Sequence, residues 1–383
     1  MSIRSASARH DPVRLVAPGV GEDGPEFRWG TLPALMAVER VEHTAQDGAR
    51  MSVPISATPL VYSDAVVTCG YDGRVRRHTR QLGSHNVVHR MNEPIYSTPA
   101  LLTDGRALVL GSRGTLACLD PDGDLLWQVH TPTPTAASPT PVDDESVAVC
   151  GLGGLLTFIS LRDGVRLWSS RLPRPWSHGI GSLDAERDPY ATPVAVGGRL
   201  VVVAGERALC VDIDGKPRWA VDLGSQVKAS PTVAPDLGLV VMALVDGRVL
   251  AVDLVTGKVT RSVALPGPVY ASPAISGDVV CVSTTREVVG LSADKLTTLW
   301  SRDIAVRDHG SITVAPDGDV VYVGHGGVVV ALAARDGAFR YELRPRTAQE
   351  RLRFDGTPVV SPDGWLYGAS YDGFVASFMF RGA

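Results

Sequence analysis

The stretch that decides the fold is VYASP, residues 269–273, because close variants of it return along the whole chain. The other copies are IYSTP ending at Pro99, PYATP at Pro193, VKASP at Pro231 and FDGTP at Pro358. In each copy two small residues precede a proline, which cannot donate a backbone hydrogen bond to a sheet. A phrase that recurs in this way indicates a repeat architecture.

The spacing of the phrase fixes the kind of repeat. Its eight positions are Pro59, Pro99, Pro139, Pro193, Pro231, Pro273, Ile312 (in HGSIT) and Pro358. The intervals are 40, 40, 54, 38, 42, 39 and 46 residues, and a period near 40 is typical of propeller blades with four strands each. The sequence therefore predicts an all-β protein, an eight-bladed β-propeller of four-stranded antiparallel blades.

One unit shows four short strands within a repeat. YSTPALLT (96–103), RALVLGS (106–112), TLACLD (115–120) and LLWQVH (125–130) are separated by turns that contain glycine or aspartate. The small-small-proline phrase starts the first of them. A sheet tolerates proline at an edge or at the first residue of a strand, so we expect the phrase to mark the innermost strand, where small residues let eight strands approach one axis.

A tryptophan recurs four residues after a glycine. The pairs are Gly123/Trp127, Gly164/Trp168 and Gly215/Trp219, and Trp300 occupies the same slot in a blade without the glycine. We expect these rings to fill the wedge between neighbouring blades rather than to act in catalysis.

The two ends of the chain predict how the ring closes. The last unit, residues 356–380, supplies three strands, and EDGPEFRW (22–29) resembles PDGDLLW (121–127), with Trp29 in the tryptophan slot. We expect residues 22–29 to complete the last blade and so to remove an exposed sheet edge. Residues 1–21 are then predicted to be a flexible arm, and residues 22–380 a single propeller domain.

Composition narrows the class of protein. The net charge is −4 and the isoelectric point about 6.1, without the basic excess of a nucleic-acid-binding protein. The first 24 residues contain no apolar core of a secretory signal, and no stretch is apolar for long enough to span a membrane. The five cysteines, an odd number with no CxxC pair, lie in apolar runs. We expect buried reduced thiols in a cytoplasmic protein; a disulfide or a reactive thiol remains the alternative.

The repeats resemble a known family. DLVTG (253–257), DIDGKPRW (212–219) and the recurring small-small-proline phrase are similar to the repeats of pyrroloquinoline-quinone-type propellers, which include quinoprotein alcohol dehydrogenases and BamB-type assembly lipoproteins. The resemblance covers about residues 22–380 and implies the fold. The quinoprotein enzymes carry an adjacent cysteine pair over the cofactor and the lipoproteins a signal peptide with a lipidated cysteine. This sequence shows neither feature, so we expect no quinone and no other cofactor.

The residues that precede the phrase point to a functional face. In a propeller, the connections that enter the innermost strands and the turns between second and third strands share one face. The position just before the phrase holds Ser56, Tyr96, Ala136, Tyr190, Lys228, Tyr270, His309 and Asp355. We interpret this set as a ligand or partner surface at the axial mouth; ordinary polar lining of a water-filled channel is the alternative.

Three long connections strengthen this interpretation, because loops on a rigid scaffold often carry binding residues. Residues 171–189 bring Trp176 and His178, residues 344–355 are rich in arginine, and residues 31–55 are partly helix-like. The short YDG turns add Tyr71 and Tyr371 as further binding candidates, although YDG is also a good turn sequence by itself.

Two other patterns are discounted. Gly151, Gly153 and Gly154 lack the lysine and the following helix of a phosphate-binding loop. His78, His85 and His89 match no recognised zinc spacing, so no metal site is expected.

The sequence favours a cytoplasmic binding or scaffold protein that holds a small molecule, a peptide or a protein partner at its axial face, without nucleic acid or membrane. The alternative is a cofactor-independent acid–base enzyme, such as a lyase, isomerase or cyclase. In that enzyme His309 or Asp355 would be the base, a tyrosine the acid, and Lys228 would stabilise a developing negative charge.

Overall fold

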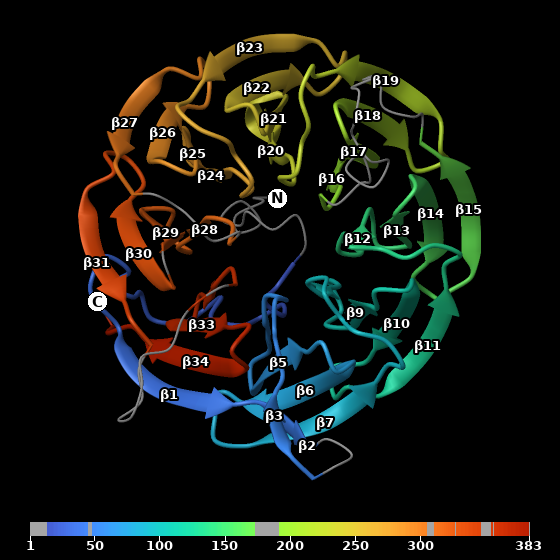
Figure 1. Cartoon of the computed structure of the whole chain (residues 1–383), viewed down its shortest axis with the longest axis vertical. Helices are drawn as coiled ribbons and strands as arrows, with labels where there is room; N and C mark the ends of the chain where they lie inside the picture. Colours follow the sequence, from blue (N-terminus) through green and yellow to red (C-terminus); the bar gives the residue numbers. More distant parts are fainter. Residues whose placement is uncertain are drawn as a thin grey trace.

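The computed structural model describes residues 14–44, 48–172, 191–304, 310–325, 327–345, 354 and 356–382. In this part of the chain, eight four-stranded antiparallel sheets stand around a common axis as the blades of a propeller (Figure 1). The predicted fold class is therefore confirmed.

Blades 1 to 7 each consist of four consecutive strands, ordered from the axis outward. Blade 1 contains β4 (Leu60–Val61), β5 (Ala65–Cys69), β6 (Arg74–Thr79) and β7 (His85–Arg90). Blade 2 contains β8 (Ala100–Leu101), β9 (Ala107–Leu110), β10 (Thr115–Leu119) and β11 (Leu125–His130). Blade 3 contains β12 (Thr140–Pro141), β13 (Ser146–Gly151), β14 (Leu155–Ser160) and β15 (Arg166–Arg171). Blade 4 contains β16 (Val194–Val196), β17 (Arg199–Ala204), β18 (Arg207–Asp212) and β19 (Pro217–Asp222).

The remaining blades follow the same order. Blade 5 contains β20 (Thr232–Ala234), β21 (Leu239–Ala243), β22 (Arg248–Asp253) and β23 (Val259–Ala264), with a short 3₁₀ helix at Pro235–Leu237. Blade 6 contains β24 (Ala274–Ser276), β25 (Val279–Ser283), β26 (Val288–Ser292) and β27 (Thr298–Arg302). Blade 7 contains β28 (Thr313–Val314), β29 (Val320–His325), β30 (Val328–Ala333) and β31 (Phe339–Leu343). Blade 8 contains β32 (Val359–Ser361), β33 (Trp365–Ala369), β34 (Phe374–Met379) and, as its outer strand, β1 (Ala34–Arg40). The strands β2 (Glu42–Thr44) and β3 (Arg50–Ser52) form a separate hairpin. Among the described residues, no helix has the length and apolar character needed to cross a membrane.

The repeated proline stands where the sequence predicts it. In all eight blades the residue at the proline position immediately precedes the innermost strand, as Pro99 precedes β8 and Pro273 precedes β24. The position at which proline has no backbone N–H therefore lies at the start of a strand, where the hydrogen bonds between strands do not require that donor.

The residue before the proline has a second role that its small size did not predict. It is serine or threonine in every blade, and in six of the eight blades its hydroxyl accepts a hydrogen bond from the equivalent backbone N–H of the preceding blade. The links are Thr58 to Thr98 (3.2 Å), Ser138 to Thr192 (3.1 Å), Thr192 to Ser230 (3.0 Å), Ser230 to Ser272 (3.0 Å), Ser272 to Ser311 (3.4 Å) and Ser311 to Thr357 (2.9 Å). These hydroxyls tie neighbouring innermost strands together around the axis.

The tryptophans fill the wedges between blades, as predicted. Trp219 of blade 4 donates from its indole nitrogen to the carbonyl of Leu254 in blade 5 (2.9 Å). A Cβ atom on Gly257 would lie 2.6 Å from the Trp219 ring, so this glycine is required by the ring of the preceding blade. The same arrangement joins Trp127 to Leu161, Trp168 to Ile213 and Trp300 to Ala334.

An N-terminal strand does complete the last blade, but it is not the predicted one. β1 pairs antiparallel with β34 from Ala34 opposite Met379 to Arg40 opposite Phe374. The prediction that residues 22–29 form this strand is wrong: Trp29 packs edge-on against Phe380, with ring centroids 4.8 Å apart, beyond the end of β34. The described part of residues 31–55, residues 31–44 and 48–55, is likewise not helix-like, because it supplies β1 and the strands β2 and β3.

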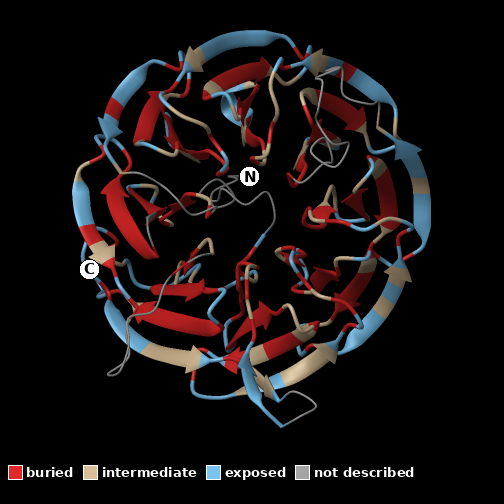
Figure 2. Cartoon of the chain, viewed as in Figure 1, coloured by how far each residue is buried: buried red, intermediate tan, exposed pale blue. Residues whose placement is uncertain are grey.

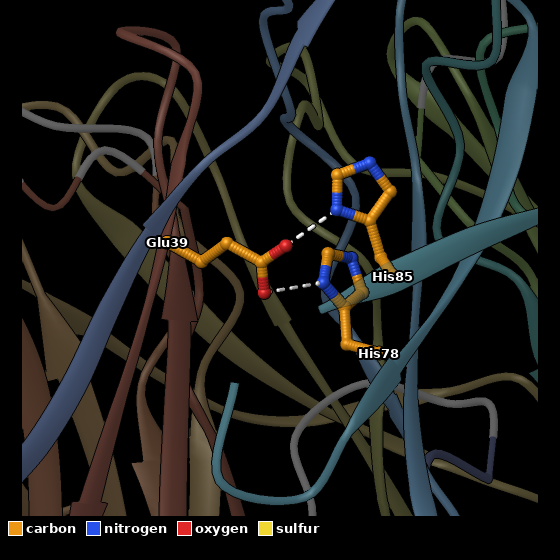
Figure 3. A group of neighbouring side chains, drawn as sticks. All are labelled: Glu39, His78 and His85. Atoms are coloured by element: carbon orange, nitrogen blue, oxygen red, sulfur yellow. Dashed lines mark hydrogen bonds and ion pairs between the residues drawn. The ribbon is translucent and has the colours of Figure 1, made fainter. Parts of the chain in front are cut away.

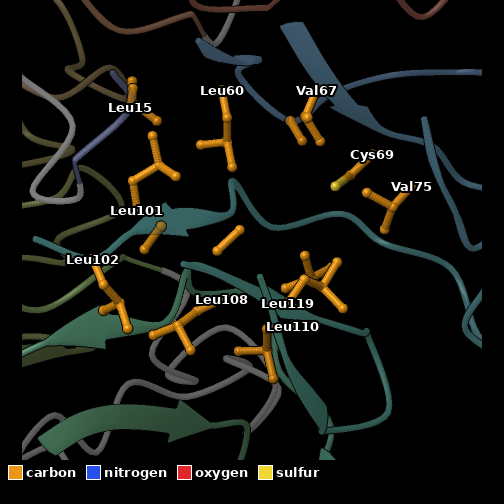
Figure 4. Close-up of a cluster of buried hydrophobic side chains, with 14 of the residues drawn as sticks. Leu15, Leu60, Val67, Cys69, Val75, Leu101, Leu102, Leu108, Leu110 and Leu119 are labelled. Carbon is orange, nitrogen blue, oxygen red and sulfur yellow. The ribbon is translucent and has the colours of Figure 1, made fainter. Parts of the chain in front are cut away.

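The N-terminal segment begins to pack before residue 22. The N–H groups of Ala17 and Val61 bond to the carbonyls of Val61 and Leu15 (2.7 and 2.8 Å), and the N–H of Leu101 bonds to the carbonyl of Arg14 (2.8 Å). Leu15 is buried in one cluster with Leu60 and Leu101 (Figure 4). Residues 14–20 therefore lie against β4 and β8 instead of forming the end of a flexible arm.

The apolar core lies between the blades. The three inner strands of each blade are mostly buried and the outer strands are mostly exposed (Figure 2). All five cysteines are buried and unpaired, as expected. Burial raises the pKa of Cys69, Cys150 and Cys281 to about 12, so these thiols stay protonated and unreactive at neutral pH.

Candidate functional site

One face of the propeller carries both the connections that enter the blades and the turns between second and third strands. The N–H of Tyr71 bonds to the carbonyl of Pro54 (3.0 Å) in blade 1, and the N–H of Ser112 bonds to that of Pro94 (2.9 Å) in blade 2. Each bond joins such a turn to the connection that enters the same blade. We call this side the loop face.

Three of the predicted tyrosines meet on the loop face. The ring of Tyr71 lies edge-to-face with that of Tyr96, with centroids 4.5 Å apart, and with that of Tyr371, 5.9 Å away. Tyr71 belongs to a turn of blade 1, Tyr96 to the connection into blade 2, and Tyr371 to a turn of blade 8. The rings of Tyr96 and Tyr371 are 43% and 48% exposed, so this tyrosine cluster is open to a partner.

Buried charged groups hold the cluster in place. The carboxylate of Asp72, next to Tyr71, forms two bonds with the guanidinium of the buried Arg76 (3.0 and 2.5 Å). Burial would raise the pKa of Asp72, but the hydrogen bond and charge of Arg76 outweigh this and lower it. The carboxylate is therefore ionised at neutral pH and fixes the turn.

A second buried carboxylate anchors the connection that carries Tyr96. Glu93 is buried and accepts hydrogen bonds from the N–H groups of Arg113 and Thr115 in the turn of blade 2. The hydroxyl of Ser56 donates to the carbonyl of Tyr96 (3.1 Å). Because these three hydrogen bonds act near the backbone of Tyr96, its ring is presented from a rigid segment.

The phenol groups of the cluster are suited to hydrogen bonding rather than proton abstraction. Burial raises the pKa of Tyr71 to about 12; a hydrogen bond with Ser56 opposes this, and one with Tyr371 adds to it. Tyr71 is thus neutral at physiological pH, and it combines an apolar ring with a donor and an acceptor.

Two other predicted site residues that the structure describes, Tyr270 and Lys228, are not brought into this cluster. Tyr270, 39% exposed, precedes β24 of blade 6, and the half-buried Lys228 precedes β20 of blade 5. In a ring of eight, blades 5 and 6 lie across the axis from blades 1 and 2 (Figure 1). The remaining predicted residues, Tyr190, Trp176, His178, His309 and Asp355, lie outside the described residues. The enzyme hypothesis needs Lys228, His309 and Asp355 close together, and it gains no support here.

A cavity that the sequence did not predict lies on the opposite face, between blades 2 and 3. It has a volume of about 250 Å³ and is lined in part by Arg14, Asp104, Arg106, Asp143 and Asp144. Arg106 donates to Asp104 (2.7 Å) and to the carbonyl of Leu161 (2.6 Å). The aspartates that line the cavity resemble ordinary turn residues in the sequence, so no motif distinguishes them.

Comparisons with known proteins agree with the fold. The family described as outer membrane protein assembly factor BamB matches residues 71–177, 174–260 and 236–382. Similar curated proteins are the BamB of Burkholderia pseudomallei (25% identical over 252 residues) and the beta-alanine-activating enzyme of Drosophila melanogaster (25% over 278 residues). The matches cover 61% and 57% of this chain, but only 62% and 27% of those proteins.

Solved structures show the same architecture. BamB from Moraxella catarrhalis has a TM-score of 0.69 and 19% identity, covering 91% of this chain and all of that one. The C-terminal WD40 domain of Sif2 has a TM-score of 0.67 and 13% identity, covering 91% of this chain and 99% of that domain. At such identities the likeness concerns the fold alone.

Proposed function

The chain belongs to the family of the outer membrane protein assembly factor BamB, and from this premise we propose that it is a binding protein whose loop face holds a segment of a protein partner. The family description names an assembly factor, and such a role rests on contacts with other proteins. A propeller is suited to it because its rigid blades present many connections on one face.

The observation that carries the proposal is the tyrosine cluster. Tyrosine is enriched in protein interfaces and among their energetically dominant residues, since it buries a large ring and keeps a polar hydroxyl. Tyr96 and Tyr371 expose close to half of their surface, and the ring of Tyr71 contacts both of their rings. The cluster spans blades 8, 1 and 2, which suits an extended peptide segment better than a compact small molecule.

The side chains favour a partner with aromatic, aliphatic or proline residues next to free backbone polar groups. The rings offer edge-to-face and stacking contacts, and the hydroxyls can bond a peptide carbonyl or N–H. The nearby carboxyl groups of Asp72 and Glu93 are already bonded to groups of this chain, so charge pairing is not the main source of recognition.

The test is affinity purification from the cells that produce the protein, with quantitative comparison of wild type, Tyr96→Ala and Leu167→Ala. Leu167 is 53% exposed on the outer strand β15, so its truncation removes a similarly exposed apolar group far from the loop face. We expect a protein that co-purifies with wild type and Leu167→Ala and is reduced at least about tenfold with Tyr96→Ala, the loss typical of a hot-spot residue.

A partner retained equally by all three proteins would contradict the proposal, and so would its equal loss from both variants. Native mass spectrometry of the purified proteins tests for a bound small molecule. If a small molecule is bound to wild type and lost from Tyr96→Ala, the loss identifies a ligand site and the protein-partner proposal is wrong. The proposed cytoplasmic location rests on the sequence alone, and cell fractionation with immunoblotting tests it.

A further inference from the structure

Two histidines and a glutamate meet where the ring closes. Glu39 lies on β1, the outer strand of blade 8, while His78 lies on β6 and His85 on β7 of blade 1 (Figure 3). One carboxylate oxygen of Glu39 contacts Nδ1 of His78 (3.0 Å) and the other contacts Nδ1 of His85. One potential ligand atom from each residue lies within 4.8 Å of the other two.

The group is enclosed rather than spread over the surface. The side chain of His78 is fully buried, and those of Glu39 and His85 are 14% and 24% exposed. The two imidazole rings lie 5.0 Å apart with a tilt of 43°, and the carboxylate faces both (Figure 3).

The far side of His78 carries the support that metal-binding histidines usually have. Its Nε2 lies 2.9 Å from the hydroxyl of Thr68 on β5. A ligating histidine almost always bonds through its other ring nitrogen to an oxygen, which fixes the tautomer and the ring orientation. If a metal ion replaces the proton that Nδ1 shares with Glu39, Nε2–H can donate to Thr68 and the Nδ1 lone pair then points toward the ion.

We propose that Glu39, His78 and His85 bind a divalent first-row transition-metal ion, for which Zn²⁺ is the best match. Two imidazoles and one carboxylate are a known zinc ligand set, with a water molecule as the fourth ligand of a tetrahedron. Bond lengths of about 2.0–2.1 Å require ligand atoms roughly 3.3 Å apart, so the present separations need only small side-chain movements. This proposal replaces the expectation of no metal, which considered His78, His85 and His89 alone.

An ion at this position would act on the closure of the ring. It would join the N-terminal strand β1 of blade 8 to two strands of blade 1. Metal bound to the folded state but not to the unfolded one stabilises the fold by mass action.

The test uses the full chain after chelation with EDTA and removal of the chelator, titrated with Zn²⁺ in competition with a chromophoric chelator. The variants are His85→Gln and Glu39→Gln, with His130→Gln as the matched control, since His130 lies exposed on β11 of the next blade. We expect one Zn²⁺ per chain for wild type and His130→Gln. The affinity should be at least about tenfold weaker for the other two, because loss of even a supporting partner costs 10–100-fold.

Equal affinities of wild type and His85→Gln overturn the proposal, as does the absence of one-to-one binding to wild type. A measurement on the wild-type protein alone covers the case in which a variant does not fold: Co²⁺ substitution should give the intense visible bands of a tetrahedral site. Only the weak bands of hexaaquo Co²⁺ would overturn the proposal, whichever variants fold.

Discussion

Two pairs of neighbouring blades, 4 with 5 and 8 with 1, are held together by different kinds of side-chain contact. Between blades 4 and 5, the Trp219 ring covers Gly257 and bonds to the carbonyl of Leu254. Between blades 8 and 1, which we call the closure seam, charged and imidazole side chains take the place of a tryptophan. There the outer strand β1 faces blade 1 with Glu39.

The closure seam contains a second polar centre nearer the axis. Arg80 of blade 1 is buried and donates to Asp363 of blade 8 (2.5 Å) and to the carbonyl of Tyr62 (2.6 Å). Its guanidinium lies over the rings of Trp365 and Tyr367, 5.7 and 5.5 Å from their centroids. This arginine is therefore paired, hydrogen-bonded and packed on two aromatic faces.

The difference shows what each contact must specify. Blades 4 and 5 are adjacent in the chain, so a short connection already brings them together and an apolar wedge is sufficient. Blades 8 and 1 meet through segments from opposite ends of the chain, and β1 must also choose its register on β34. Groups that are satisfied only by particular partners penalise a shifted register, which explains why polar pairs concentrate at the closure seam.

The largest expected effect is on the apolar wedge. Trp219 is 8% exposed, and Trp219→Ala removes its indole, which leaves the carbonyl of Leu254 without its hydrogen-bond donor. We expect the free energy of unfolding to fall by about 3–5 kcal/mol, measured by denaturant unfolding. Leu167→Ala, on an exposed outer strand, should change it by less than about 0.5 kcal/mol. Similar losses of unfolding free energy in both variants would show that the tryptophan wedge contributes no more to stability than an exposed leucine.

The next largest effect concerns the closure seam. Asp363→Asn leaves the buried guanidinium of Arg80 without its carboxylate. We expect a loss of about 2 kcal/mol, below the 3–5 kcal/mol of a fully buried pair because Asp363 is 30% exposed. The exposed pair of Lys216 and Asp214 provides the control, since Asp214→Asn should have no measurable effect on unfolding. If Asp363→Asn unfolds like wild type, the seam does not depend on this ion pair.

The smallest effect is a pH dependence that belongs to the closure seam alone. The pKa of His78 is lowered from its ordinary 6.5 mainly by burial, and that of Glu39 is lowered from 4.5 by His78 and His85 although burial opposes this. His78 faces Glu39, His85 and Arg76. Because both pKa values are lower in the folded protein, the unfolded chain binds more protons as the pH falls. The stabilisation is then complete above about pH 6.5 and is lost as the pH falls through the folded-state values.

The measurement is the unfolding midpoint from pH 7.5 to 4.5 with EDTA present, so that no metal contributes. The slope of stability should not exceed about 1.4 kcal/mol per pH unit for each titrating group. His78→Gln should flatten the part of the curve below pH 6.5, whereas His130→Gln should follow wild type. His89, whose pKa burial also lowers, leaves a residual slope in His78→Gln. Superimposable curves for His78→Gln and wild type would contradict the assignment.

Features that repeat could be predicted from the sequence. The small-small-proline phrase located all eight innermost strands, and the glycine–tryptophan spacing located the wedges at Trp127, Trp168, Trp219 and Trp300. Tyr71, Tyr96 and Tyr371 were each assigned to the loop face from their place in a repeat, and their rings do meet there. Whether they bind a partner stays a prediction.

Features that occur once could not be predicted in this way. The closing strand has neither the turn nor the tryptophan of an ordinary outer strand. The turn and Trp29 in residues 22–29 therefore predict the closing strand there, although residues 34–40 form it. Glu39 is 39 residues from His78 in the chain, and no local spacing connects them. The hydroxyls that link Ser230 to Ser272 were visible in the sequence only as small residues, because their acceptor role depends on the neighbouring blade.

The position of β1 has a consequence for biosynthesis. β1 is synthesised well before its partner β34, which ends at Met379, about 340 residues later in the chain. At the usual 5–20 residues per second, the strand waits roughly 20–70 s on the ribosome with both edges unpaired. Blades 1 to 7 can form as they emerge, whereas blade 8 can assemble only after β34 has been made. During that interval the nascent chain is an open arc, and an N-terminal strand that pairs with another copy instead of β34 would join two chains into one aggregate.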